Sequence, residues 1–284
     1  MTKIEIQESC CRFGEHQQLT GVITEPVNAA PRIAFVLVSA GLTPKFGPFR
    51  FYAELARRLS GEGLLTLRFD LGGIGDSGKG YAGRPLIERT ELEIRAAVDY
   101  LDERNDLDGI ILGGLCSGAE DSFRYAEIDP RVTGLMLMDP FGYKTWGWRS
   151  RDVLIRLARR SLWTLGLLPT YGGKDDAAAL IDYAHMDHAE SSRILQSLIR
   201  RRVPMHFVYT GGMRESFNHK RQLNAMFGKI DFRGLVALDY FPQLRHTQAL
   251  EEDRRMVIES IARRCPRALH AARPRFEPIA RRAE

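Results

Sequence analysis

The residues best suited to chemistry in this chain surround Cys116. An apolar run, residues 109–113 (Gly-Ile-Ile-Leu-Gly), leads into residues 114–118 (Gly-Leu-Cys-Ser-Gly). Small residues two positions before and two after Cys116 permit a sharp strand-to-helix turn, where a Cβ would collide with a neighbouring element. Such a turn, a nucleophile elbow, exposes one side chain, here cysteine instead of the usual serine. Ser117 does not fit the same frame, because the residue two before it is Leu115.

A thiol is a strong nucleophile only after losing its proton, so we expect a histidine base and a carboxylate that orients the histidine. His246 follows the last predicted strand, 236–241, and precedes a predicted helix, which makes it the expected base. Glu215 lies just beyond another apolar run and two glycines, and it is the expected acid. Asp139, directly after the apolar run 132–138, is the alternative acid and ranks second.

Backbone N–H groups usually stabilise the oxyanion that forms when a nucleophile attacks a carbonyl group. Ser117 supplies one expected donor, because it follows the nucleophile at the start of a helix. The second donor is expected in the loop after the apolar run 33–38, where Leu42 is the first choice and Gly41 the second.

No cofactor and no metal are expected. The cysteines have neither metal-ligand nor disulfide spacing; they are Cys10, Cys11, Cys116 and Cys265. His185 and His188, with one carboxylate between them, are too few ligands for a metal site. The glycine-rich residues 72–80 lack the Gly-Lys-Ser/Thr ending of a phosphate-binding loop.

Strands alternate with helices along most of the chain. The predicted strands are 3–13, 17–24, 33–38, 64–69, 109–113, 132–138, 203–209 and 236–241, and the predicted helices are 48–60, 86–103, 118–128 and 247–264. This alternation predicts right-handed βαβ units and a mostly parallel sheet flanked by helices, an α/β fold. The alternation stops over 141–201, where aromatic and basic helical segments predict an inserted cap.

The domain prediction follows directly: a core over 1–140 and 202–264, a helical cap over 141–201, and a basic tail over 265–284 that is expected to be disordered. From Arg263 onward seven arginines and two glutamates give +5, the net charge of the whole chain, so the remainder sums to zero. No nucleic-acid partner is expected, and an anionic membrane is the other partner considered for the tail.

The bulk composition is that of an ordinary globular protein, with 284 residues, 44% hydrophobic and 27% charged. No apolar stretch of about 18 residues predicts a membrane span. The N-terminal residues alternate like a strand and lack a signal-peptide core. With so few cysteines, the expected setting is the reducing cytoplasm.

Residues 70–77 (Asp-Leu-Gly-Gly-Ile-Gly-Asp-Ser) resemble the D-x-x-G-x-G-x-S loop of the α/β-hydrolase superfamily, and the likeness extends over about residues 20–262 apart from the cap. Residues 67–70 together with 114–116 resemble the hydrolases associated with exosortase A systems, which often carry a cysteine elbow. Dienelactone hydrolases and polyhydroxyalkanoate synthases are similar in this cysteine. The chain departs from the usual pattern at Ala40, where many members have histidine, and at Glu215, where most have aspartate.

The resemblance implies the α/β-hydrolase fold with a helical cap, and hydrolysis of an ester, thioester or lactone through an acyl-enzyme on Cys116. The substrate would be a small molecule or an acyl group on a carrier. Two alternatives stay open: an acyltransferase with the same Cys116–His246–Glu215 triad, and a non-catalytic binding protein on this fold. The sequence does not indicate an oligomeric state.

Overall fold

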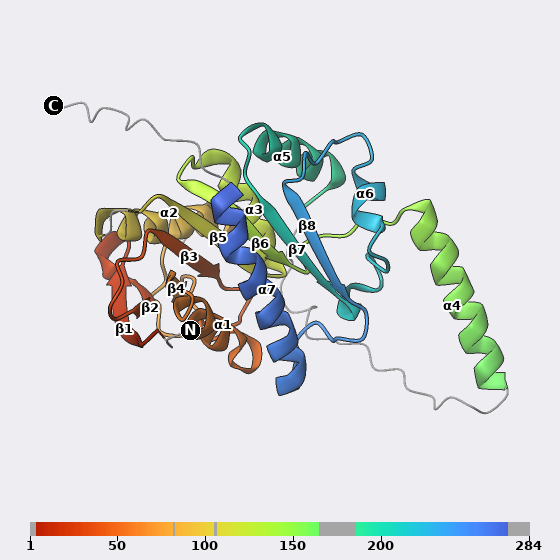
Figure 1. Ribbon diagram of the computed structural model, residues 1–284, viewed down its shortest axis with the longest axis horizontal. Helices are drawn as coiled ribbons and strands as arrows, with labels where there is room; N and C mark the ends of the chain where they lie inside the picture. Colours follow the sequence, from red (N-terminus) through yellow and green to blue (C-terminus); the bar gives the residue numbers. More distant parts are fainter. Residues whose placement is uncertain (1–3, 82, 105–106, 165–185, 272–284) are drawn as a thin grey trace.

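A computed structural model describes residues 4–81, 83–104, 107–164 and 186–271 (Figure 1). Its centre is an eight-stranded sheet in the order β1-β2-β4-β3-β5-β6-β7-β8. The strands are β1 (Ile6–Phe13), β2 (Leu19–Pro26), β3 (Ile33–Val38), β4 (Leu65–Phe69), β5 (Gly109–Leu115), β6 (Val132–Met138), β7 (Met205–Thr210) and β8 (Val236–Phe241). β2 is antiparallel to β1 and β4, and the other neighbours are parallel, as the alternation predicts.

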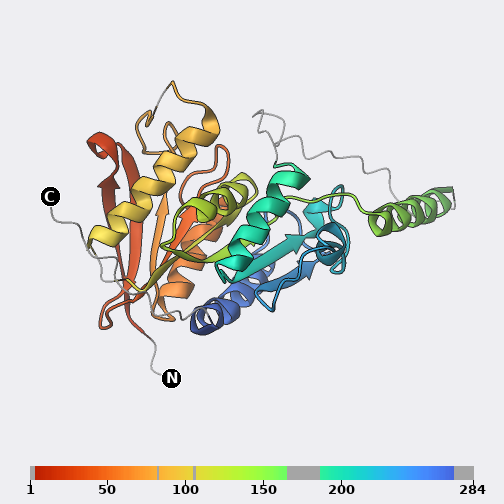
Figure 2. The same ribbon diagram turned by 90° about the horizontal axis from the view of Figure 1, so that it is seen from above.

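Helices cover both faces of this sheet (Figure 2). The α-helices are α1 (Phe51–Ser60), α2 (Leu86–Arg104), α3 (Ser117–Ile128), α4 (Trp146–Thr164), α5 (His188–Arg200), α6 (Gln222–Met226) and α7 (Glu251–Ala271). Short 3-10 helices are η1 (Glu15–Gln17), η2 (Pro48–Arg50) and η4 (Gly211–Met213). Among the described residues, none of these helices combines the length and the apolarity that crossing a membrane requires.

Two hydrophobic cores, one on each face, hold the helices to the sheet. One core joins α1 and α7 through buried side chains such as Leu55 and Ile261. The other joins α2, α3 and α5 through side chains such as Val98, Phe123 and Leu198. Strands buried on both faces are mostly apolar, which is why the continuous apolar runs in the sequence predict them well.

The region predicted as a cap divides into two parts with different packing. α4 projects away from the sheet (Figures 1 and 2), as an insertion would. α5 instead places Ile194, Leu195 and Leu198 in the main core. A parallel connection from β6 to β7 needs a crossover helix on the sheet face, and α5 occupies that position. The cap prediction for 165–185 lies outside the described residues.

The C-terminal boundary also differs from the prediction. α7 continues to Ala271, seven residues beyond its predicted end at 264, so the first part of the expected tail is helical. Cys265, on this extension, is buried at 8% exposure, and burial raises the pKa of its thiol to about 12. The rest of the predicted tail, 272–284, lies outside the described residues.

One tyrosine joins the strand ends that lead to Cys116. Tyr52, on α1, is 1% exposed. Its hydroxyl donates to Val38 O at 3.0 Å and accepts from Leu115 N at 2.8 Å. The phenol therefore bridges β3 and β5 where the two strands separate. Burial raises the pKa of Tyr52, so the hydroxyl remains protonated and able to donate.

We expect Tyr52→Phe to lower the free energy of unfolding by about 1–3 kcal/mol, because it leaves a buried N–H and a buried carbonyl without their partner. Chemical denaturation with wild type as reference measures this loss. Tyr240→Phe is the matched control, because Tyr240 is only half-buried and its hydroxyl makes no hydrogen bond to a described residue. Equal stability of the two variants would show that the bridge contributes nothing.

Candidate functional site

Cys116 occupies a strained turn between β5 and α3. Its backbone angles are φ 55° and ψ −122°, in the positive-φ region that L-residues rarely adopt. Cys116 N donates to Met138 O at 2.9 Å, and Cys116 O accepts from Ala119 N at 3.0 Å. The side chain is half-buried at the edge of the α1–α7 core. This is the geometry expected of a nucleophile elbow.

The two small residues of the elbow are required by close backbone approach. A Cβ on Gly114 would lie 2.7 Å from Val38 O and from the carbonyl carbon of Gly118. A Cβ on Gly118 would overlap Val38 O as well. The turn can therefore press α3 against the ends of β3 and β5 only when both flanking residues are glycine.

His246 lies in the loop after β8, and its ring is held by a buried carboxylate. His246 Nδ1 donates to Asp139 Oδ2 at 2.8 Å. The Cys116 sulfur also interacts with the His246 ring and raises the pKa of the imidazole. The structure thus brings Cys116, His246 and Asp139 into one chain of contacts.

Asp139 takes the place expected of Glu215 beside the histidine. Asp139 is fully buried, whereas Glu215 is exposed beyond η4. Thr210 donates to Asp139 from its backbone N at 2.7 Å and from Oγ1 at 2.6 Å. Asp139 is beside the histidine because β6 pairs with β7, so that the residue after β6 lies next to Thr210 at the end of β7. Glu215 lies farther along the chain, in a turn where its side chain is exposed.

Two further features hold the histidine loop, and sequence reasoning missed both. A Cβ on Gly212 would lie 2.6 Å from His246 N, and one on Gly211 would overlap Pro242 O. The Gly-Gly pair therefore lets the two loops touch. Gln248, fully buried, donates from Nε2 to Arg245 O at 3.0 Å and also to His246 O. The two glycines before Glu215 were the sequence signal of this close contact.

The candidate oxyanion donors lie beside the elbow. Ser117 is the first residue of α3, and its Oγ accepts from Gly41 N at 3.0 Å. This bond ties the loop after β3 to the elbow and engages the Gly41 N–H. The backbone N–H of Leu42 makes no hydrogen bond to any residue in the described part of the chain. Of the two expected loop donors, Leu42 is the one whose N–H is available.

Buried Asp70 holds the loop after β3 through hydrogen bonds from Lys45. Lys45 donates to it twice, from the backbone N at 2.5 Å and from Nζ at 2.6 Å, and Nζ also reaches Asp76 at 2.6 Å. A Cβ on Gly75 would overlap the Asp70 carboxylate, which explains the glycine. The glycine-rich segment 70–77 thus supports the loop that carries Leu42.

The environment of His246 favours its protonated form. Burial alone lowers the pKa of the imidazole, but the interactions of the ring with Asp139 first and with Cys116 second raise it from 6.5 to about 10. The side chain is 30% exposed. At neutral pH the site therefore favours the protonated form of His246, whose ring lies between the Asp139 carboxylate and the Cys116 sulfur.

The raised pKa of His246 predicts a pH-dependent stability. A group with a folded pKa above its unfolded value stabilises the fold fully below the unfolded value, and the contribution disappears as pH rises through the folded value. The stability difference between wild type and His246→Gln should therefore shrink as the pH rises from about 6.5 to about 10. Denaturant unfolding over that range measures it; a difference independent of pH would contradict the assignment.

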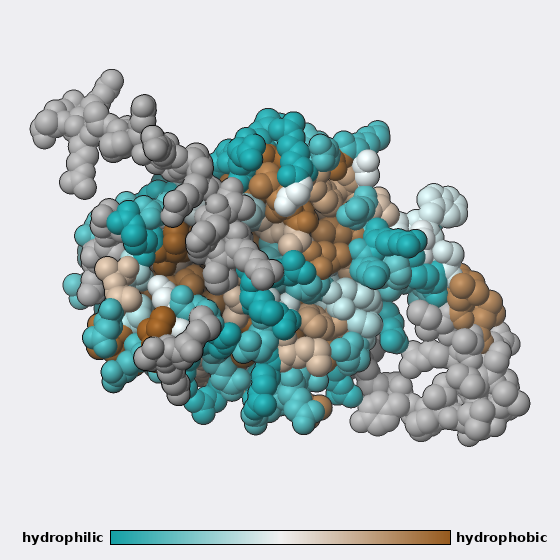
Figure 3. Space-filling model, viewed as in Figure 1, coloured by the Kyte–Doolittle hydropathy of each residue, from teal (hydrophilic) through white to brown (hydrophobic). Residues whose placement is uncertain are grey.

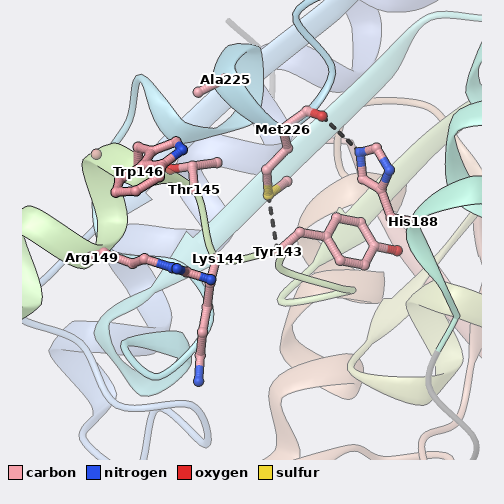
Figure 4. A pocket seen from close by; sticks show the side chains of 9 residues that line it. Tyr143, Lys144, Thr145, Trp146, Arg149, His188, Ala225 and Met226 are labelled. Atoms are coloured by element: carbon pink, nitrogen blue, oxygen red, sulfur yellow. Dashed lines mark hydrogen bonds between the residues drawn. The ribbon is translucent and has the colours of Figure 1, made fainter.

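A cavity of about 580 Å³ opens where the chain leaves Asp139 for α4 (Figure 4). Lys144, Trp146 and Arg149 line one side of it, and Tyr143 and His188 line the other. His188 Nε2 bonds Met226 O at 2.8 Å, and the ring stacks on Phe227. In the described part of the chain, no three His, Cys, Asp or Glu side chains are grouped to hold a metal ion; His185 lies outside it.

Solved structures similar to this chain have the α/β-hydrolase fold. An esterase of Pyrococcus furiosus is 12% identical, with 95% of this chain and 91% of that chain covered and a TM-score of 0.61. An α/β-hydrolase of Penicillium sp. sh18 is 19% identical, with 94% and 99% covered and a TM-score of 0.58. The esterase domain of a Rhodothermus marinus protein is 14% identical, with 93% and 99% covered and a TM-score of 0.57.

No protein-family model matches the sequence, and no curated protein matches it either. At these identities the structural likeness establishes the fold, and the expected α/β-hydrolase fold is confirmed. What this chain does must be argued from its own residues.

Proposed function

We propose that this protein hydrolyses a carboxylic ester or thioester through an acyl-enzyme on Cys116. The observation that carries the proposal is the chain of contacts from Cys116 at the strained turn, through His246, to the buried carboxylate of Asp139. Its three members come from widely separated segments, which is difficult to explain by local packing alone. The esterase and hydrolase neighbours agree with this reaction class.

The first half of the reaction forms the acyl-enzyme. Cys116 Sγ attacks the carbonyl carbon while its proton is held by His246 at Nε2, the ring nitrogen that does not face Asp139. The carbonyl oxygen becomes an oxyanion, which the N–H groups of Leu42 and Ser117 stabilise. When the intermediate collapses, the bond to the alcohol or thiol breaks, and His246 protonates this leaving group.

The second half releases the acid. His246 removes a proton from water, the resulting hydroxide attacks the thioester carbon, and Sγ leaves as the nucleophile is regenerated. Asp139 holds Nδ1 throughout, so that the other ring nitrogen faces the sulfur. Its charge also stabilises the imidazolium. We assign the role of orienting acid to Asp139 instead of Glu215 on this geometry.

Acyl transfer is the second candidate, because a cysteine acyl-enzyme is a thioester that amines and thiols attack readily. The same residues would act, and only the group that resolves the acyl-enzyme would differ. The substrate in either case is a small ester or an acyl thioester on a carrier. Product analysis with and without an added amine or thiol acceptor separates the two reactions.

Intact-protein mass spectrometry after incubation with a panel of activated esters and acyl thioesters tests the nucleophile. We expect one acyl adduct, mapped by peptide analysis to Cys116, and none in Cys116→Ala. Cys116→Ser, which keeps an oxygen nucleophile at the turn, should retain at most weak acylation. An adduct on Ser117, or turnover by Cys116→Ala, would refute the proposed mechanism.

The choice of acid is tested by a matched pair of carboxylate-to-amide variants. Asp139→Asn should lower kcat by about a thousandfold or more, because the amide no longer stabilises the imidazolium or fixes its tautomer. Glu215→Gln should leave kcat essentially unchanged, because Glu215 is exposed. Steady-state kinetics on any ester that acylates Cys116 gives both values. Loss of kcat in Glu215→Gln with retention in Asp139→Asn would reverse the assignment.

A further inference from the structure

Two anchors near the beginning of α4 attach the helix to the body. Trp148 is 6% exposed, and its Nε1 donates to Arg214 O at 3.0 Å. Arg151 donates from Nε to Asn218 Oδ1 at 2.9 Å. Beyond these anchors the helix extends away from the sheet (Figures 1 and 2). Its outer face is therefore displayed to the surroundings.

That outer face is apolar. Trp146 is 86% exposed, Val153 53%, Leu154 64% and Leu157 57%. At 100° per residue these four positions fall within an arc of about 100° on the helix surface. Trp148, which packs on the body, lies on the opposite side. Figure 3 shows a brown, hydrophobic area on α4.

Cationic residues accompany this stripe. Residues 146–164 contain five arginines and one aspartate, a net charge of +4. Arg149 is exposed, contacts the Trp146 ring and makes no ion pair with a described residue. Arginines recur in the sequence at 156 and 160, seven and eleven residues after Arg149. The cavity at the base of α4 adds Lys144, and none of the described residues that line it is a carboxylate.

We propose that α4 docks this protein on an anionic phospholipid surface. A helix that lies in a bilayer interface has a Trp- and Leu-bearing apolar face beside a strip of arginine or lysine, as α4 has. The apolar stripe would enter the acyl boundary, while Arg149 and Lys144 would meet lipid phosphates. This docking is separate from the proposed reaction and does not depend on it.

Other partners fit the same surface less well. A second copy would bring two helices of net charge +4 together, which costs electrostatic energy. A nucleic acid would use the arginines but has no need for exposed Val153 and Leu154. An anionic bilayer takes up both features at once, because it offers negative charge at its surface and hydrocarbon just below.

Vesicle co-sedimentation of the full-length protein tests the proposal. With phosphatidylglycerol in phosphatidylcholine vesicles we expect binding at least about tenfold stronger than to phosphatidylcholine alone, and weaker binding at high salt. Val153→Glu/Leu154→Glu should lower the partition coefficient by about tenfold or more, since two apolar side chains no longer enter the bilayer. Arg149→Glu should also weaken binding, because it reverses a charge that attracts lipid phosphates and leaves the apolar stripe unchanged.

The matched control is Val27→Glu/Ile128→Glu, which adds the same charge at two exposed apolar residues outside α4 (44% and 50% exposed). This variant should bind vesicles like wild type. Truncation after Ala271 removes residues 272–284, the part of the basic tail beyond α7, and binding should persist without it. Circular dichroism melting confirms that each variant is folded before its binding is compared.

Several outcomes would overturn the proposal. Equal vesicle binding by wild type and Val153→Glu/Leu154→Glu would exclude the stripe, and complete loss on truncation would assign the contact to the tail. Binding to neither vesicle would exclude a lipid partner. In that case light scattering showing a dimer that Val153→Glu/Leu154→Glu dissociates would assign the stripe to a second copy.

Discussion

The arrangement of the site depends most on one buried carboxylate. Removing a charged carboxylate from water is unfavourable unless hydrogen-bond donors replace the lost solvent, and Asp139 receives three. Two come from Thr210 on the neighbouring strand and one from His246. The requirement to satisfy this single group therefore joins the ends of β6 and β7 to the loop after β8. The hydrogen bond to Asp139 holds the His246 ring in place. The same carboxylate favours the protonated imidazole, which raises the pKa of His246.

The second constraint is crowding at Val38 O, where three elements meet. The carbonyl accepts from Tyr52, and both elbow glycines approach it so closely that neither tolerates a Cβ. The positive φ of Cys116 is unfavourable for an L-residue, yet the surroundings leave no other path from β5 into α3. The strain at the cysteine is thus maintained by ordinary packing and one phenol bridge, and it directs the sulfur toward His246.

Sequence periodicity predicted the sheet well, because strands buried on both faces must be continuous apolar runs. The buried strands 33–38 and 132–138 have the predicted bounds. The edge strand 236–241 has them too, although it is only half-buried and contains Asp239. The choice of acid required more than sequence, since Asp139 and Glu215 both follow apolar strands. Only the pairing of β6 with β7 and the contact of the 211–212 turn with the histidine loop decide which carboxylate faces the ring. The sequence prediction places α5 in the cap. Its amphipathic pattern indicates that one face is buried, but not which surface that face packs against.

α4 begins close to the candidate active site along the chain, so a surface that binds this helix would also lie near the site. Only residues 140–145 separate Asp139 from the start of α4, so a docked helix would hold the site at a short, defined distance from the bilayer. This connection is itself fixed, because Tyr209 donates to Phe141 O at 2.7 Å and Trp148 to Arg214 O. Docking would then leave the geometry around His246 unchanged, since that geometry has its own hydrogen bonds. The membrane contact that we propose would thus determine where acyl groups meet Cys116, while Asp139 and His246 determine what happens to them.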